Sequence, residues 1–77
     1  MPDLLLIKDG RRLGVECKRM DAPKLTASMR TAMQDLDLDR LIVLYPGPHP
    51  YPLAERISVM PLAELARRLD LLYSIAG

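Results

Sequence analysis

Residues 3–18 read DLLLIKDGRRLGVECK and are the most informative part of the chain. Two apolar runs flank the pair Asp9-Gly10, which is typical of the type I′ turn, where both central residues have positive φ. A two-residue turn at this point pairs Lys8 with Arg11 and sets the antiparallel register of both strands. The sequence therefore predicts a β-hairpin whose opposing residues can be counted outward from the turn.

The predicted register brings charged side chains together at the open end of the hairpin. Asp3 falls opposite Glu16, and Lys18 lies two residues further along the same face. A longer loop through Arg12 would shift the pairing by an even number and keep both carboxylates on one face. Opposed Cβ atoms lie about 5 Å apart, so two carboxylates there repel unless a cation lies between them.

This arrangement is a candidate metal-dependent phosphodiesterase site. Mg²⁺ held by Asp3 and Glu16 would polarise a phosphoryl oxygen, with Lys18 acting as catalytic base or as a stabiliser of developing charge. The alternative is a solvated charged pair without a catalytic role, because Glu-x-Lys occurs by chance in many strands.

The pattern Asp3…Glu16-x-Lys18 resembles that of the PD-(D/E)XK, or restriction-endonuclease-like, superfamily. More closely, the chain is similar to the C-terminal domain of a family of bacterial and archaeal AAA-type ATPases that carry a nuclease-like tail. The likeness extends over nearly the whole chain as short matches in order. The matching segments are residues 2–6, 14–19, 21–26, 28–30, 39–41, 45–47, 51–56 and 60–62.

The resemblance implies a restriction-endonuclease-like core, joined in longer relatives to an N-terminal P-loop ATPase module. Two departures limit it. No Gly-x-x-x-x-Gly-Lys-[Ser/Thr] motif occurs here, so this chain cannot hydrolyse ATP by that route. The superfamily core also begins with a helix and a strand before the aspartate, whereas Met1 stands two residues before Asp3. We therefore expect a truncated core.

The middle of the chain predicts a helix followed by a buried strand. Apolar residues recur at helical spacing from Leu25 to Leu36, and Thr26 or Asp21 can cap the helix. Residues 41–45 form a continuous apolar run suited to a strand that is covered on both faces. Together with the second strand of the hairpin, these elements predict a right-handed βαβ crossover.

The last third predicts a loop, a strand and a helix. Residues 46–52 are so rich in proline that we expect a rigid surface loop, in which His49 has no chemical role. A short strand over residues 56–60 follows, and Pro61 begins the final helix. The fold class is thus α/β, a small mixed sheet of order β-β-α-β-β-α, forming one domain over residues 1–77. The apolar stripe of the final helix comprises Leu62, Leu65, Ala66, Leu69, Leu72 and Tyr73.

Composition indicates the cellular compartment of the chain and limits its partners. The net charge of +1 provides no long-range field for nucleic acid, which leaves a nucleic-acid partner undecided. No segment approaches the roughly 20 apolar residues of a membrane span, so we expect no membrane partner. A single cysteine indicates a reducing compartment and a cytoplasmic protein. Strand alternation places Cys17 with Leu13 and Val15, and predicts a buried core thiol.

These features favour a non-catalytic or weakly active C-terminal module of an AAA-type ATPase, serving assembly or substrate engagement. The first alternative is a Mg²⁺-dependent nuclease unit, and the second is a fragment without independent activity. A domain of 77 residues buries only about 60% of its unfolded surface and is marginally stable. Because the apolar strand over residues 4–7 lacks the strand and helix that would cover it, we expect a homodimer at micromolar concentration.

Overall fold

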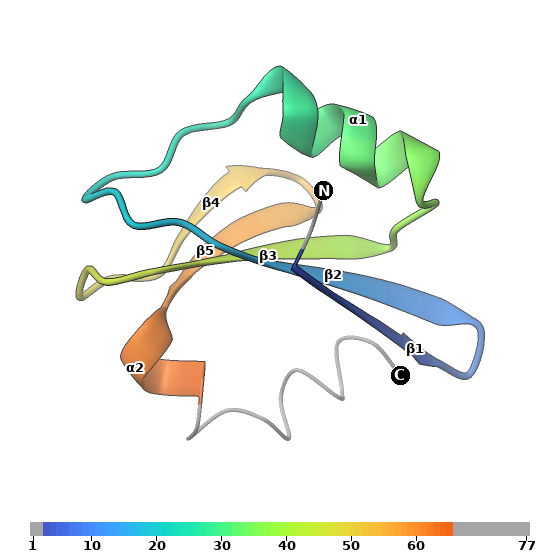
Figure 1. Ribbon diagram of the computed structural model, residues 1–77, viewed down its shortest axis with the longest axis horizontal. Coiled ribbons are helices and arrows are strands. Elements are labelled where there is room, and N and C mark those ends of the chain that lie inside the picture. The colour runs from blue at the N-terminus through green and yellow to red at the C-terminus, as the bar shows by residue number, and fades with distance from the viewer. Residues whose placement is uncertain (1–2, 66–77) are drawn as a thin grey trace.

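The computed structural model describes residues 3–65 as a five-stranded mixed sheet with helix α1 on one side and helix α2 on the other (Figure 1). The strands lie in the order β1-β2-β3-β5-β4, in which β2, β3 and β5 are parallel to one another. The outer strands β1 and β4 are antiparallel to their neighbours. The elements are β1 (Leu4–Lys8), β2 (Arg11–Cys17), α1 (Ala27–Asp35), β3 (Arg40–Tyr45), β4 (Tyr51–Ala54), β5 (Ile57–Pro61) and α2 (Leu62–Leu65).

The hairpin forms with the register that the sequence predicts. Asp9 and Gly10 have φ values of 52° and 80°, as a type I′ turn requires. Lys8 pairs with Arg11, and the pairing continues without a shift to Leu4 opposite Val15. The turn therefore fixes which face of β1 and β2 each side chain occupies.

Helix α1 begins after Thr26, which is the cap among the two candidates. The Thr26 side chain accepts a hydrogen bond of 3.2 Å from the Met29 backbone N–H, which satisfies one of the unpaired donors at the helix start. Met29 and Ala32 are the buried residues of the helix. Since β2 and β3 are parallel on either side of α1 in sequence, the predicted β-α-β unit is confirmed.

Each face of the sheet carries its own apolar cluster. The cluster beneath α1 includes residues of the helix and of β3 and β5, and the opposite cluster includes residues of β2, β3 and β5. The α1 cluster comprises Met29, Leu38, Leu41, Val43, Tyr45, Ile57 and Val59. The opposite cluster comprises Leu13, Val15, Ile42, Leu44 and Met60, with Leu6 of β1 packed against it.

Strand β4 is an element that the sequence prediction missed. Residues 46–52 were expected to form a loop throughout, but Tyr51 and Pro52 begin a strand that pairs with β5. Proline has no backbone N–H to donate to a neighbouring strand. It is tolerated in β4 because this strand lies at the edge of the sheet and has a neighbour on one side only. The order of elements is therefore β-β-α-β-β-β-α, with one strand more than predicted.

The end of β5 also differs from the prediction. Pro61 pairs with Tyr45 as the last residue of the strand, and the helix begins one residue later, at Leu62. Beyond Leu65, the predicted apolar stripe lies outside the described residues. Neither helix within residues 3–65 is long and apolar enough to cross a membrane.

The connection from β3 to β4 is organised around Tyr45. Its hydroxyl donates to the His49 carbonyl and accepts a hydrogen bond of 3.1 Å from the His49 N–H. Its ring meets that of Tyr51 edge to face, with centroids 5.8 Å apart. A Cβ atom on Gly47 would overlap the Tyr45 ring, so only glycine fits at that position. His49 takes part in these hydrogen bonds through its backbone.

Tyr51 in turn ties β4 to the segment that precedes α1. Its hydroxyl donates a hydrogen bond of 2.7 Å to the Pro23 carbonyl, across 28 positions of sequence. Burial, with a smaller contribution from Tyr45, raises the pKa of Tyr51 above its ordinary value of 10.0. The tyrosine pair therefore holds the proline-rich end of the sheet in place.

Candidate functional site

Asp3 lies at the open end of the hairpin and acts there as a backbone cap. The register places it next in line opposite Glu16, beyond the pairing of Leu4 with Val15. Its Oδ2 accepts a hydrogen bond of 2.8 Å from the Cys17 N–H. The side chain thus provides the acceptor that a continued β1 backbone would otherwise supply.

Glu16 is the buried polar residue of β2. It is 6% exposed and pairs in register with Val43 of the α1 cluster, so its side chain lies on the face that α1 covers. The Lys18 ammonium Nζ lies 3.8 Å from Glu16 Oε2. The Lys18 backbone is also fixed, because its N–H donates to the Leu44 carbonyl at 2.8 Å.

The carboxylate of Glu16 is incompletely satisfied. Within the part of the chain that the structure describes, its Oε2 accepts no hydrogen bond, and 3.8 Å is an ion-pair distance rather than a hydrogen-bond distance. Burying a carboxylate oxygen without a hydrogen bond is costly. Glu16 Oε2 therefore retains the capacity to accept a hydrogen bond or to contact a cation.

The structure brings together Glu16 and Lys18 as predicted and places Asp3 at the adjacent strand end. The Asp3 carboxylate, however, is engaged by a backbone N–H through Oδ2. Among residues 3–65, no group of three histidine, cysteine, aspartate or glutamate side chains is close enough together to hold a metal ion. Any cation held here would have Asp3 and Glu16 as its protein ligands and would need further ligands from solvent or substrate.

Cys17 does not lie in the core as predicted. It is exposed and has a free thiol, whereas Leu13 and Val15 are buried. Strand alternation gives the face of a side chain, but Cys17 is the last residue of β2 and lies beyond the pairing of β1 with β2, which ends at Leu4 and Val15. Together with Lys18 and Arg19, Cys17 borders a depression of about 290 Å³ at the end of the parallel strands. Its other lining residues are Leu44, Tyr45, Pro46 and Leu62.

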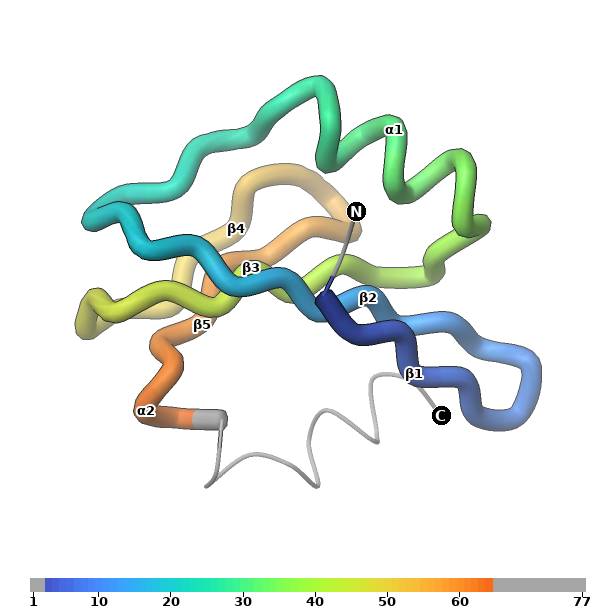
Figure 2. The backbone as a smooth tube through the Cα atoms, in the orientation of Figure 1, coloured from blue at the N-terminus to red at the C-terminus, as the bar shows by residue number. Residues whose placement is uncertain are grey.

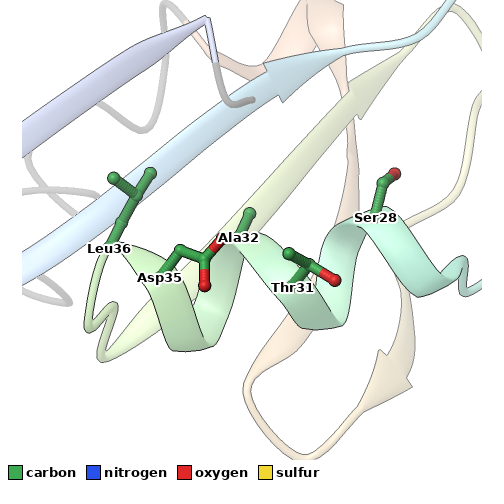
Figure 3. Close-up of a pocket in the computed structure, with 5 residues that line it drawn as sticks. All are labelled: Ser28, Thr31, Ala32, Asp35 and Leu36. Atoms are coloured by element: carbon green, nitrogen blue, oxygen red, sulfur yellow. The ribbon is translucent and has the colours of Figure 1, made fainter.

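A second depression lies along one side of α1, away from the candidate site residues. Its volume is about 320 Å³, and Asp35 is its charged lining residue. Figure 3 shows its lining side chains along α1 and at its C-terminal end: Ser28, Thr31, Ala32, Asp35 and Leu36. Neither Asp3, Glu16 nor Lys18 contributes to it, so it offers no substrate pocket for those residues.

Arg12 has a structural role that the sequence did not reveal. Its Nε donates to the Leu36 carbonyl at 2.7 Å, which satisfies a carbonyl at the end of α1. Its backbone N–H donates to Asp39 Oδ2, and the Asp39 N–H returns a hydrogen bond to the Arg12 carbonyl, both at 2.8 Å. Arg12 and Glu16 are an even number of residues apart on β2, so both side chains lie on the face that α1 covers. This spacing does not predict that Arg12 bonds to Leu36 and Asp39.

The chain is similar to two longer mycobacterial proteins. Uncharacterized proteins of Mycobacterium bovis and Mycobacterium tuberculosis are each 40% identical to it over 63 residues, which is 82% of this chain. The chain spans 14% of the length of either relative. No protein-family model and no solved structure matches it.

Proposed function

We propose that the chain is a non-catalytic or weakly active module of a longer AAA-type ATPase, where it serves assembly or substrate engagement. The observation that carries the proposal is the use of the Asp3 carboxylate as a cap for the Cys17 N–H. Because one oxygen of Asp3 completes the strand ladder, only part of the carboxylate is available to an ion. The small share of the mycobacterial relatives that the chain matches supports a role within a larger protein. We also propose a cytoplasmic location, which agrees with the free thiol of Cys17.

The second candidate is a Mg²⁺-dependent nuclease unit, and the incompletely satisfied Oε2 of Glu16 favours it. Asp3 and Glu16 would hold the ion, which supplies Lewis-acid polarisation of a phosphoryl oxygen when bound. The Lys18 side chain is 36% exposed, and its Nζ lies 3.8 Å from Glu16 Oε2. Its ammonium would stabilise negative charge that develops on substrate.

Metal-dependent cleavage of supercoiled plasmid separates these candidates. The chain is incubated with plasmid and Mg²⁺ or Mn²⁺, beside Lys18→Ala and the control Lys24→Ala, which removes an exposed lysine that forms no ion pair with Glu16. We expect slow nicking at most, equal in all three proteins. Robust nicking that Lys18→Ala abolishes and Lys24→Ala retains would refute the non-catalytic role and establish the nuclease.

Metal binding gives an independent reading of the same site. We expect Mn²⁺ titration calorimetry to show weak binding at best, because Asp3 is exposed and is already engaged by the Cys17 N–H. Tight binding that is lost in Glu16→Gln would contradict the proposal, provided that circular dichroism shows the variant folded.

A further inference from the structure

Within residues 3–65, no strand pairs with the outer backbone edge of β1, as the tube in Figure 2 shows for the outer side of the hairpin. In a hairpin with a two-residue turn, the two residues that flank the turn are hydrogen-bonded to each other through their backbones. The backbone N–H and C=O groups of Lys8, and of every second residue before it, therefore point toward β2. Cys17 and Lys18 follow the same alternation. The Cys17 N–H donates to Asp3, on the β1 side, and the Lys18 N–H donates to Leu44 of β3, on the other side. The N–H and C=O groups of Leu5 and Ile7 therefore point away from the sheet.

The side chains along the same edge are apolar and exposed. Leu4 is 51% exposed, Leu5 is 36% exposed and Ile7 is 60% exposed. Leu5 and Ile7 lie on the face of α1, and Leu4 lies on the opposite face, so apolar surface flanks the open backbone edge on both sides. An edge strand of this kind is a template for pairing with another strand.

We propose that the occupant of this edge is β1 of a second copy of the chain, paired antiparallel about a two-fold axis at Leu6. This inference rests on the proposed assembly function and specifies its surface and partner. Leu5 would then pair with the partner's Ile7, and Ile7 with the partner's Leu5. Both residues direct their backbone groups outward, so each pair exchanges two hydrogen bonds, and the contact closes on itself as an isologous dimer.

The charges at the two ends of the hairpin select this orientation. Asp3 marks the open end, while the turn carries three basic residues and one acidic residue: Lys8, Arg11, Arg12 and Asp9. Antiparallel pairing keeps the two basic turns apart, whereas parallel pairing would bring them together.

The apolar side chains select the register. An axis at Leu5 would place Ile7 opposite the partner's Asp3, and an axis at Ile7 would place Leu5 opposite the partner's Asp9. The axis at Leu6 instead matches apolar residues with apolar residues at its three central positions, and it confines the like-charged pair of Asp3 and the partner's Asp9 to the two ends of the paired strands.

Sedimentation equilibrium of the whole chain tests the interface. We expect a dimer with a micromolar dissociation constant, weakened at least about tenfold in Ile7→Lys, because two copies of the side chain are lost from each interface. The matched control is Leu62→Lys, which replaces another apolar residue, 52% exposed, outside β1. We expect it to change the dissociation constant by less than about twofold. A folded monomer at high micromolar concentration, or equal weakening by both variants, would overturn the inference.

Disulfide formation tests the register. In a Cys17→Ser background, Leu6→Cys places two thiols at the two-fold axis, where opposed Cα atoms of a non-hydrogen-bonded pair lie about 4.5 Å apart. Leu4→Cys places its thiols about 13 Å apart along the strands, which is too far for a disulfide. We expect mild oxidation to link Leu6→Cys and to leave Leu4→Cys unlinked, with circular dichroism confirming that both are folded. Failure of Leu6→Cys to link, or equal linking of both, would refute the proposed pairing.

These measurements are separate from the plasmid assay. A dimer that cleaves plasmid through Lys18 would retain the interface and refute the non-catalytic role. A monomer that leaves plasmid intact would refute the interface alone.

Discussion

The two edges of the sheet are built in opposite ways. At one edge, β4 is a strand of 4 residues interrupted by Pro52 and by an irregular register between Pro52 and Ala54. At the other edge, β1 has 5 residues in regular register and exposes Leu4, Leu5 and Ile7. Proline, bulges and short length are devices that stop a sheet from pairing further, and β4 has all of them.

The difference indicates where the sheet ends and where it continues. A strand that carries protective devices needs no partner, and the tyrosine pair holds β4 from within the molecule. Strand β1 carries no proline or bulge between Leu4 and Lys8, and its apolar side chains gain most when another strand covers them. Strand β1 is therefore the edge suited to association, and β4 is the edge that ends the sheet.

The largest loss of stability is expected from Gly47→Ala, which attacks the closed edge. The added methyl group would overlap the Tyr45 ring, and relieving that overlap costs about 2 to 3 kcal/mol of unfolding free energy. Urea unfolding measures the loss. The control is the same change in a Tyr45→Leu background, where a smaller side chain makes the cost of the added methyl lower. An equal cost in both backgrounds would show that the ring is not the obstacle.

Asp3→Ala changes the residue that precedes β1 and removes the acceptor of the Cys17 N–H. We expect it to lower the free energy of unfolding by about 1 to 1.5 kcal/mol. Asp3→Asn keeps a carbonyl oxygen at the same position and should lose less than the alanine variant. Hydrogen exchange of the Cys17 amide, which should speed up in Asp3→Ala, gives a local reading beside urea unfolding. Unchanged exchange would show that the cap does not protect the strand end in solution.

Tyr51→Phe removes the hydroxyl that donates to the Pro23 carbonyl and should lower the free energy of unfolding, by less than Asp3→Ala does, while keeping the ring pair with Tyr45. The raised pKa of Tyr51 means that the folded state holds the hydroxyl proton more tightly than the unfolded state. This contribution is therefore complete below the ordinary pKa of 10.0 and is lost as pH rises through the higher folded pKa. Urea unfolding at a series of pH values should show the advantage of the wild type over Tyr51→Phe shrinking above pH 10.0. An advantage that grows with pH would contradict the assignment.

The smallest change in stability is expected from Pro52→Val, within about 0.5 kcal/mol, since Pro52 is exposed on an edge strand. Its effect should appear in assembly. A second strand able to pair gives each molecule two different adhesive edges, which form open chains instead of closed dimers. Sedimentation velocity should detect species larger than the dimer. A variant that sediments as the wild type does would show that the bulge alone protects β4.

The sequence predicted what local geometry determines. The turn at Asp9-Gly10 sets the register by its length, so the pairing of Lys8 with Arg11 and the shared face of Glu16 and Lys18 followed by counting. Strand β4 was missed because its prolines are a local signal for a loop, whereas the pairing that makes it a strand is with β5, later in the chain.

In the candidate site, too, only the features that depend on local geometry were predicted. Spacing along β2 gives the approach of Glu16 to Lys18, but the engagement of Asp3 with the Cys17 N–H depends on where the backbone ladder of β1 stops. The exposure of Cys17 depends on how far the apolar cover reaches over the sheet, which alternation along a strand does not determine.

The two-residue turn at Asp9-Gly10 also has a consequence for the order of folding. A hairpin closes in about 1 to 10 µs because its partners are neighbours in sequence, whereas the parallel pairing of β2 with β3 must wait for the longer segment through α1 to collapse. The nascent hairpin therefore presents its outer edge before the rest of the domain has assembled. We expect refolding yield to fall as chain concentration rises, because encounters between nascent hairpins compete with completion of each domain.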